Sequence, residues 1–266
     1  MLSARRLRAS QHPYFDAPFI AMAHRGGALL PANIGRENTL HAFARAVELG
    51  YRYLETDVHV TADGTLVAFH DDRLDRVTDR AGLIAELPWA EVRKARIGGH
   101  DAVPTLDELL DAFPDRRFNI DIKAPGAVDP LVRTLAAHRA EDRVCVGSFG
   151  VDRIRAFRRR TGGSVATSLS QVGVAWTRFL PLVPRVLPAP GLALQIPIHT
   201  EIRGRQVRLV TRGLIARAHA AGLHVHVWTI DDPRVMHELL DLGIDGLISD
   251  RIDVLREVCE ERRLWN

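Results

Sequence analysis

Residues 53–70 read YLETDVHVTADGTLVAFH, and this stretch decides the fold. Successive side chains of a strand point to opposite faces, so Glu55 and Asp57 share one face of an extended chain. Two apolar arms flank the segment 61–64, whose Asp-Gly pair is typical of a hairpin turn. The stretch therefore predicts a strand that carries two carboxylates on one face and continues into a β-hairpin.

The strand pattern recurs along the chain, with helical patterns between successive strands. The predicted strands are Phe19–Ala23, Tyr53–Val58, Phe118–Ile122, Val144–Gly147, Val165–Ser168, Leu192–Ile196, His224–Trp228 and Gly246–Ile248. About eight strand–helix units in roughly 250 residues are typical of a closed parallel barrel. We predict a single α/β domain over residues 1–266, a (β/α)8 TIM barrel with a hairpin-containing insertion after the second strand and an N-terminal extension over 1–18. A doubly wound open sheet is the alternative, although no Gly-x-Gly-x-x-Gly follows the first strand.

Capping residues mark several predicted helices. One apolar stripe at i, i+3, i+4 and i+7 consists of Leu40, Phe43, Ala44 and Val47. Thr105 and Glu108 predict a capping box. The pairs 129–130 and 232–233 are both Asp-Pro, which predicts an N-cap followed by proline at the first helical position, and Gly243 closes the second of these helices.

Composition excludes several classes of protein. The chain has 266 residues, of which 46% are hydrophobic and 26% charged, so it is neither disordered nor a membrane-spanning protein. A net charge of +3 is too small to indicate nucleic-acid binding. Cys145 and Cys259 are the only cysteines, and no apolar segment follows the basic N-terminus, so we expect a cytoplasmic protein without disulfides.

Polar residues also alternate in the third predicted strand, where Asn119, Asp121 and Lys123 share one face. Branched apolar side chains normally fill a barrel, so inward carboxylates are costly unless they are paired or bind a cation. Outward-facing acids in structural ion pairs are the alternative. Lys123 is one of two lysines among 36 cationic residues, which favours a role that needs a point charge.

The hairpin brings a histidine towards the acids. A turn at Asp63-Gly64 pairs position 57 with His70, and a turn one residue earlier pairs position 55 with His70. In either register the histidine faces a carboxylate across the hairpin, at about 5.5 Å or less between Cα atoms. A histidine beside two acids at a barrel mouth favours a functional site over a structural role.

Short polar motifs follow the predicted strands in a fixed order. They are His24-Arg25-Gly26, Glu37-Asn38-Thr39, Glu55-x-Asp57, His70-Asp71, Asn119-x-Asp121-x-Lys123 and Trp228-Thr229. The connecting segments include Thr61-x-Asp63-Gly64, Pro104-Thr105-Leu106-Asp107-Glu108 and Gly243-Ile244-Asp245-Gly246. From about Ala21 to Asp250, this set resembles the glycerophosphodiester phosphodiesterase family.

The resemblance implies a (β/α)8 barrel that hydrolyses glycerophosphodiesters to glycerol 3-phosphate and an alcohol. It implies one divalent cation, Mg²⁺ with Ca²⁺ or Mn²⁺ as alternatives. The implied cation ligands are Glu55, Asp57 and Asp121. His24 and His70 would act as acid and base, and Arg25 and Lys123 would contact the phosphate. Glu37 would support the site without binding the cation.

The chemistry agrees with these roles, since a phosphodiester needs its oxygens neutralised and its leaving alkoxide protonated. Three positions depart from the family's usual residues: Asp121 replaces Glu, Asp231 replaces Asn and Ile252 replaces Pro. The first of these bears on the geometry of the cation site. Whether water or the neighbouring glycerol hydroxyl attacks first is left open, as are the alcohol group and the oligomeric state.

Two weaker features lie near the predicted mouth. Trp228 could contact the substrate or pack at the rim, whereas His224 and His226 are read as structural. The apolar segment 172–187 could be a lid or a lipid-contacting surface, but a packed loop is favoured. The expected partner is a small phosphodiester. Lysophospholipase D activity on membrane lipids is the alternative, and a barrel that binds without turnover is disfavoured because no acid or histidine is missing.

Overall fold

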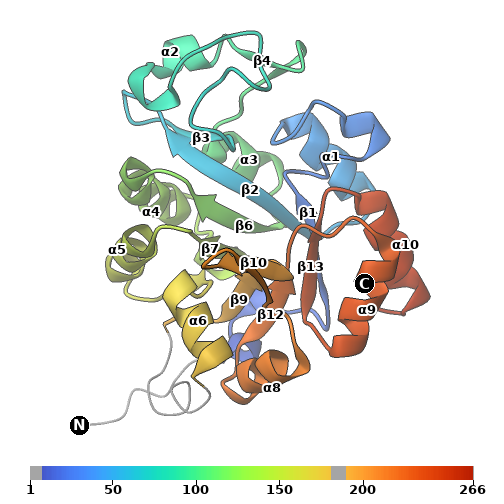
Figure 1. The fold of residues 1–266 in the computed structure, drawn as a ribbon. Coiled ribbons are helices and arrows are strands. Elements are labelled where there is room, and N and C mark those ends of the chain that lie inside the picture. The colour runs from blue at the N-terminus through green and yellow to red at the C-terminus, as the bar shows by residue number, and fades with distance from the viewer. Residues whose placement is uncertain (1–7, 181–189, 266) are drawn as a thin grey trace.

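Eight parallel strands form the centre of the computed structural model, which describes residues 8–180 and 190–265 (Figure 1). In sheet order they are β8 (Ala166–Thr167), β7 (Val144–Gly147), β6 (Arg117–Ile122), β2 (Tyr53–Val60), β1 (Ile20–His24), β13 (Gly246–Ser249), β12 (His224–Val227) and β9 (Ala193–Ile196). Each predicted strand corresponds to one of these. The predicted (β/α)8 architecture is therefore confirmed.

The two ends of the sheet meet at a short junction. Ser168 forms a parallel bridge with Ala193. The Leu169 amide donates to the Ala193 carbonyl at 2.7 Å, and the Leu192 amide donates to the Thr167 carbonyl at 2.8 Å. These bonds join β8 to β9 and close the barrel. The mouth of the barrel lies at the carboxyl ends of the strands.

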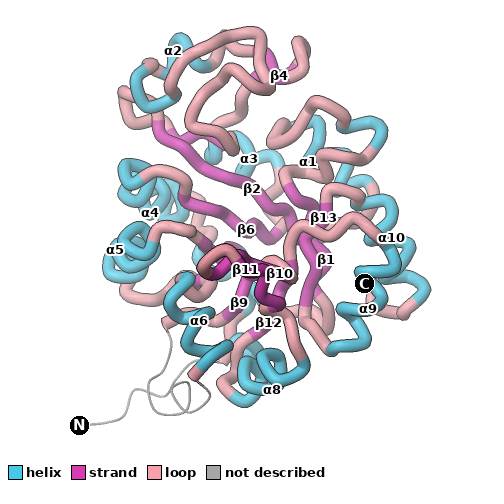
Figure 2. Tube along the Cα trace, in the orientation of Figure 1, coloured by secondary structure: helices cyan, strands magenta, loops and turns pink. Residues whose placement is uncertain are grey.

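An outer ring of helices surrounds the strands (Figure 2). The helices that follow the eight strands are α1 (Leu40–Glu48), α3 (Leu106–Ala112), α4 (Val128–Ala137), α5 (Val151–Thr161), α6 (Gln171–Phe179), α8 (Arg212–Ala220), α9 (Pro233–Leu242) and α10 (Ile252–Glu261). Apolar side chains between this ring and the strands form the largest buried cluster. Burial of each such side chain contributes about 1.5–3 kcal/mol.

Most predicted caps are confirmed. Thr105 and Glu108 form the capping box of α3, with bonds of 3.1 and 2.8 Å. Asp232 caps α9, which ends at Gly243 in a left-handed conformation. The prediction at Asp129 is wrong: α4 begins at Val128 because a 3-10 turn runs directly into it, and the Asp129 carboxylate instead accepts from Arg160 at 2.8 Å.

The apolar stripe predicted for α1 is only partly correct. Phe43 is buried as expected, but Leu40 is 40% exposed, and Ala42 and Ala46 are buried instead. The cause is the close approach of the loop after β1, since a Cβ at Gly26 would lie only 2.8 Å from the Ala42 Cβ. Only small residues fit at that contact.

The predicted insertion after β2 is also confirmed, and most of it is loop (Figure 2). It contains β3 (Leu66–Ala68), a 3-10 turn at Ile84–Glu86, α2 (Trp89–Val92), β4 (Arg96–Ile97) and β5 (Asp101–Ala102). A small apolar cluster of its own stabilises it. A second hairpin, β10 (His199–Ile202) with β11 (Arg205–Arg208), lies between β9 and α8.

Both predicted registers of the first hairpin are wrong by one residue. Val58 pairs with Ala68, and the Phe69 amide donates to the Asp57 carbonyl at 3.0 Å, so Asp57 faces Phe69. The predictions assumed a two-residue turn. The loop instead contains three residues between Thr61 and Thr65 and ends at Gly64, whose φ of 88° is typical of such loops.

Residues 9–15 close the floor of the barrel. They form two 3-10 turns, Ala9–Gln11 and Pro13–Phe15. Tyr14 and Phe15 are buried among interior strand residues, and the Tyr53 hydroxyl donates to the Tyr14 carbonyl at 2.8 Å. Part of the predicted N-terminal extension therefore belongs to the core, whereas residues 1–7 lie outside the described residues.

The segment 172–187 is helical at its start. Residues up to Phe179 belong to α6, which Ser170 caps by accepting from the Gly173 amide. Residues 181–189 lie outside the described part of the chain. Among the described residues, no helix combines the length and the hydropathy needed to cross a bilayer.

Candidate active site

Strand register places the polar motifs side by side at the mouth. His24 at the end of β1 lies next to Glu55 of β2, and Asp57 of β2 lies next to Asp121 of β6. Because these positions follow the two-residue period of their strands, the side chains point into the barrel. The prediction that the acids face inward is confirmed.

The mouth opens into a cavity of about 690 Å³ that all eight predicted site residues line. These residues are His24, Arg25, Glu55, Asp57, His70, Asp121, Lys123 and Trp228. One side of the cavity is ionic and consists of the first seven of them. The other side is mostly apolar and includes Phe149, Leu169, Val174, Phe179, Ile202, Leu209 and Trp228.

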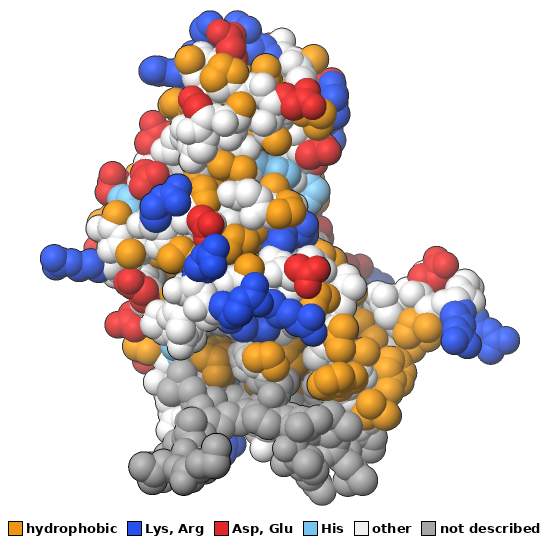
Figure 3. Space-filling view, turned by 90° about the vertical axis from the view of Figure 1, so that its left-hand side faces the viewer, with side chains coloured by type: hydrophobic (Ala, Val, Ile, Leu, Met, Phe, Trp, Pro, Cys, Tyr) orange, Lys and Arg blue, Asp and Glu red, His pale blue; other side chains and the backbone are white. Residues whose placement is uncertain are grey.

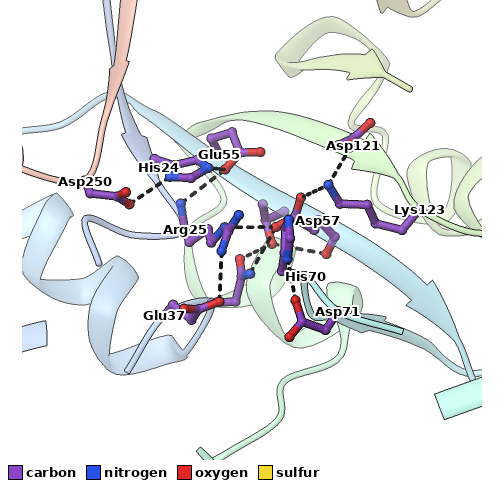
Figure 4. A network of polar contacts seen from close by, with 12 residues as sticks. His24, Arg25, Glu37, Glu55, Asp57, His70, Asp71, Asp121, Lys123 and Asp250 are labelled. Carbon is purple, nitrogen blue, oxygen red and sulfur yellow. Dashed lines mark hydrogen bonds and ion pairs between the residues drawn. The ribbon is translucent and has the colours of Figure 1, made fainter. Parts of the chain in front are cut away.

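His24 lies between two carboxylates. Its Nδ1 is 2.7 Å from Asp250 Oδ1, and its Nε2 is 3.8 Å from Glu55 Oε2 (Figure 4). Burial alone would lower the pKa of His24, but Glu55 and Asp250 outweigh it and raise that pKa. Asp250 directly follows β13, so the adjacent strand fixes the imidazole.

His70 is held by its chain neighbour. Its Nδ1 lies 2.6 Å from Asp71 Oδ1, and Arg76 Nε donates to Asp71 Oδ2 at 2.5 Å. Arg76 also donates two hydrogen bonds to Glu37, at 2.7 and 3.0 Å. The bonds from Arg76 and His70 outweigh burial and lower the pKa of Asp71 to about 2, so this carboxylate stays ionised.

Asp57 lies at the centre of the ionic network in Figure 4. Its Oδ2 lies 3.4 Å from Arg25 Nε and accepts from Asn38 Nδ2 at 3.3 Å, whereas its Oδ1 lies 2.9 Å from Lys123 Nζ. Burial would raise the pKa of Asp57, but Lys123 and Arg25 outweigh it and lower the pKa.

Lys123 bridges two strands. Its Nζ lies 2.8 Å from Asp121 Oδ2 as well as 2.9 Å from Asp57 Oδ1. For Asp121 the balance is reversed, since burial outweighs Lys123 and raises the pKa. The ammonium therefore partly neutralises two carboxylates at the mouth of the barrel.

Glu55 is the least compensated of these acids. Among the residues that the structure describes, its Oε2 accepts a hydrogen bond from the Arg25 amide alone, at 3.2 Å, and the 3.8 Å to His24 Nε2 is beyond hydrogen-bonding distance. Burial and the neighbouring Asp57 carboxylate raise the pKa of Glu55 to about 7, despite His24 and Arg25. A carboxylate held this way gains from any additional positive charge placed beside it.

The predicted cation ligands do not form a ready-made cage. Within residues 8–180 and 190–265, no three His, Cys, Asp or Glu side chains converge as metal ligands do. The Lys123 ammonium lies between Asp57 and Asp121 instead. The three acids do supply oxygen donors, which hard divalent cations prefer.

Trp228 lines the cavity and also packs against the apolar cluster that contains Tyr14 and Phe15. Its ring meets Phe149 in an edge-to-face arrangement, with centroids 5.6 Å apart. Phe149 is 54% exposed, and Lys123 Nζ lies 5.8 Å from its ring centroid. The two aromatic rings thus border the ionic side of the cavity.

Four residues of the network were not assigned a role from sequence. Asn38 and Asp71 stand inside quoted motifs, so their position beside Glu37 and His70 was the available signal. Asp250 lies two residues after the predicted strand Gly246–Ile248, a signal close to the one that identified His24. Arg76 lies in the irregular insertion, and no spacing pattern indicated it.

Comparison with known proteins assigns the fold and motifs to a family. A model of the glycerophosphoryl diester phosphodiesterase family matches residues 24–254. The chain belongs to this family. It is therefore a phosphoric diester hydrolase.

Relatives within the glycerophosphodiester phosphodiesterase family agree. The chain is 41% identical to the probable glycerophosphodiester phosphodiesterase 2 of Mycobacterium tuberculosis, over 93% of both chains. It is 27% identical to human lysophospholipase D GDPD1, over 89% of this chain and 84% of that protein. A phosphodiesterase of Oleispira antarctica, solved with sn-glycerol-3-phosphate, has the same fold with a TM-score of 0.74 at 24% identity, over 91% of this chain and 96% of that one.

Proposed function

We propose that this chain hydrolyses soluble glycerophosphodiesters to glycerol 3-phosphate and an alcohol, with His24 and His70 as proton donor and acceptor. The observation that carries the proposal is that both histidines, two cations and three acids, of which Glu55 and Asp57 are buried, line one cavity. The complex of the Oleispira antarctica relative with sn-glycerol-3-phosphate supports the choice of product.

Arg25 and Lys123 would bind the phosphoryl oxygens. Arg25 Nε is buried and has no hydrogen-bond acceptor among the described residues, although Asp57 lies nearby. A guanidinium binds phosphate through two parallel bonds, whereas an ammonium supplies a compact point charge. The two cations approach from different strands, so together they would fix the phosphate at the mouth.

The histidines are arranged for proton transfer. A carboxylate accepts from Nδ1 of each, Asp250 for His24 and Asp71 for His70. This bond selects the tautomer whose Nε2 is free to face the cavity. General acid–base catalysis by a positioned side chain contributes about 10²–10⁴-fold in rate.

Glu55, Asp57 and Asp121 fit a divalent cation by their chemistry. All three are oxygen donors at adjacent strand ends, and the raised pKa of Glu55 marks a deficit of positive charge beside it. We propose Mg²⁺, with Ca²⁺ or Mn²⁺ as alternatives. Such a cation polarises a phosphoryl oxygen and lowers the pKa of a bound water.

The decisive test follows glycerophosphocholine by phosphorus NMR with Mg²⁺, Ca²⁺, Mn²⁺ or EDTA. We expect glycerol 3-phosphate with Mg²⁺ and no turnover with EDTA. Release of phosphocholine instead would contradict the proposed bond cleavage, and full activity in EDTA would contradict the cation. The expected cytoplasmic location is tested separately by cell fractionation.

Lysophospholipase D activity is the second candidate. A human relative carries that name, and the cavity has an apolar wall next to its ionic side. An acyl chain would lie against this wall while the phosphodiester occupies the same site. Turnover of lysophosphatidylcholine above that of glycerophosphocholine would favour this activity.

A further inference from the structure

Helix α6 and the β10–β11 hairpin form one continuous rim beside the mouth. Arg178 of α6 donates to the Arg208 carbonyl of β11 at 3.4 Å from both Nε and Nη2. In Figure 3 the hairpin projects from the mouth with cationic side chains at its tip, and hydrophobic side chains lie below it. The rim therefore presents two kinds of side chain to the same side of the molecule.

The apolar part of the rim is unusual for a surface helix. One face of α6 is buried through Val174 and Thr177, yet Val172, Trp176 and Phe179 on its other sides are 41–45% exposed. An amphipathic surface helix normally exposes polar residues there. Ile202 of the hairpin, 39% exposed, adds to this patch.

The hairpin supplies the charge. Arg203, Arg205 and Arg208 are exposed, and none pairs with a carboxylate of residues 8–180 or 190–265. Glu201 is the single acid of the two strands. Arg203 and Gly204 both have positive φ, 51° and 74°, the pattern of a rigid two-residue hairpin turn. The turn holds the charges away from the barrel.

We propose that this rim docks on an anionic lipid bilayer. Exposed Trp and Phe beside unpaired arginines match the apolar boundary and the negative surface of such a bilayer. Phe179 and Ile202 also line the cavity, so docking turns the mouth towards the lipid. Docking is measured without turnover, so this inference stands apart from the proposed hydrolysis.

The test is flotation of the full chain with vesicles. We expect binding to phosphatidylcholine mixed with phosphatidylglycerol, weaker binding at high salt, and little binding to phosphatidylcholine alone. The double variant Arg203→Gly with Arg205→Ser should lose about 30-fold in partitioning, since each arginine contributes about fivefold. Its turnover of glycerophosphocholine should match wild type, because neither residue lines the cavity.

A matched control removes the same charge elsewhere. Arg155→Ser with Arg159→Ser should change partitioning less than twofold, because these exposed residues belong to α5 and not to the rim formed by α6 and the hairpin. Trp176→Phe should abolish a vesicle-induced blue shift in fluorescence while vesicle binding persists. Equal loss in both double variants, no flotation of wild type, or self-association that depends on the rim would each overturn the proposal.

Discussion

Two pairs of histidines occupy opposite ends of this barrel. His24 and His70 lie at the mouth beside carboxylates, whereas His224 and His226 lie at the floor against the Phe15 ring, with centroids 4.8 and 6.0 Å away. Asp250 and Glu55 raise the pKa of His24, but burial lowers the pKa of His226 well below 6.5. The partners, and not the residue type or its inward direction, decide what each histidine can do.

The largest expected effect is a loss of turnover when either histidine at the mouth is substituted. His24→Ala and His70→Ala should each lower turnover by about 10²-fold or more, because proton transfer is lost. Both should unfold near the wild-type temperature, since these side chains are partly exposed and bear no core packing. Phosphorus NMR and thermal unfolding measure the two quantities.

A substitution of a histidine at the floor should have the opposite effects. His226→Gln should lower stability and retain turnover, because this side chain is fully buried below the site. If His24→Ala loses as much thermal stability as His226→Gln, the mouth histidines are structural and the comparison fails.

The next effect concerns Asp121 and the cation. Aspartate is one methylene shorter than the family's usual glutamate and reaches about 1.5 Å less far. Mg²⁺ keeps several waters and needs one or two carboxylates, whereas Ca²⁺ takes six to eight oxygens. We expect Mg²⁺ or Mn²⁺ to support turnover better than Ca²⁺ in chelated enzyme titrated with each ion.

Substitutions at this position sharpen the argument. Asp121→Ala should severely weaken metal binding, and Asp121→Glu should retain activity and improve the use of Ca²⁺. Full activity of the wild type with Ca²⁺ but not with Mg²⁺ would show that ligand length does not select the ion.

A smaller loss is expected for Lys123→Arg, on the order of tenfold in kcat/KM. The planar guanidinium keeps the charge but cannot take the place of an ammonium 2.8 and 2.9 Å from two carboxylates. Lys94→Arg is the matched control, because the chain's other lysine forms an exposed pair with Glu91. Identical kinetics in both variants would make Lys123 an incidental lysine.

Arg76 tests how far the mouth network extends. Arg76→Lys should lower kcat about fivefold with little change in KM, because a lysine cannot bond Glu37 and Asp71 at once in the observed geometry. The pH profile of kcat should shift as well, since Asp71 orients His70. Arg73→Lys in the same loop, whose partner is Asp75, is the control; an unshifted profile would make Arg76 merely structural.

The smallest expected effect is a pH dependence of thermal stability caused by His226 at the floor. The pKa of His226 is lower in the folded chain than its ordinary value of 6.5, so the unfolded chain binds more protons. Stability is therefore present above about pH 6.5 and is lost as the pH falls below it. We expect the melting temperature to drop by about 2–4 °C per kcal/mol lost, and His226→Gln to flatten this dependence. A melting temperature that stays constant across this range would argue against a buried neutral His226.

Local periodicity explains which parts were predictable. The eight strands and the inward direction of Glu55 and Asp57 follow from alternation within a few residues. The register of the first hairpin does not follow from this alternation. The Asp-Gly signal is compatible with a two-residue turn and also with the three-residue loop that ends at Gly64. One residue of slip changes which side chains face each other.

Contacts between residues far apart in the sequence leave no local pattern. His24 and Asp250 are 226 positions apart, and Tyr14 and Phe15 reach the floor from a segment without strand or helix periodicity. Arg76 acts through a loop whose course depends on the insertion's own apolar cluster. Such contacts arise from closure of the barrel and leave no mark in local spacing.

The closed floor of the barrel determines how substrate enters and how products leave. With Tyr14 and Phe15 buried across the barrel's lower end, entering and departing molecules must share the mouth. The product fragment that binds deepest in the cavity leaves last, and until it leaves it blocks the next substrate molecule. Closure of that end by residues 9–15 therefore makes the last fragment to leave a competitor of the next substrate.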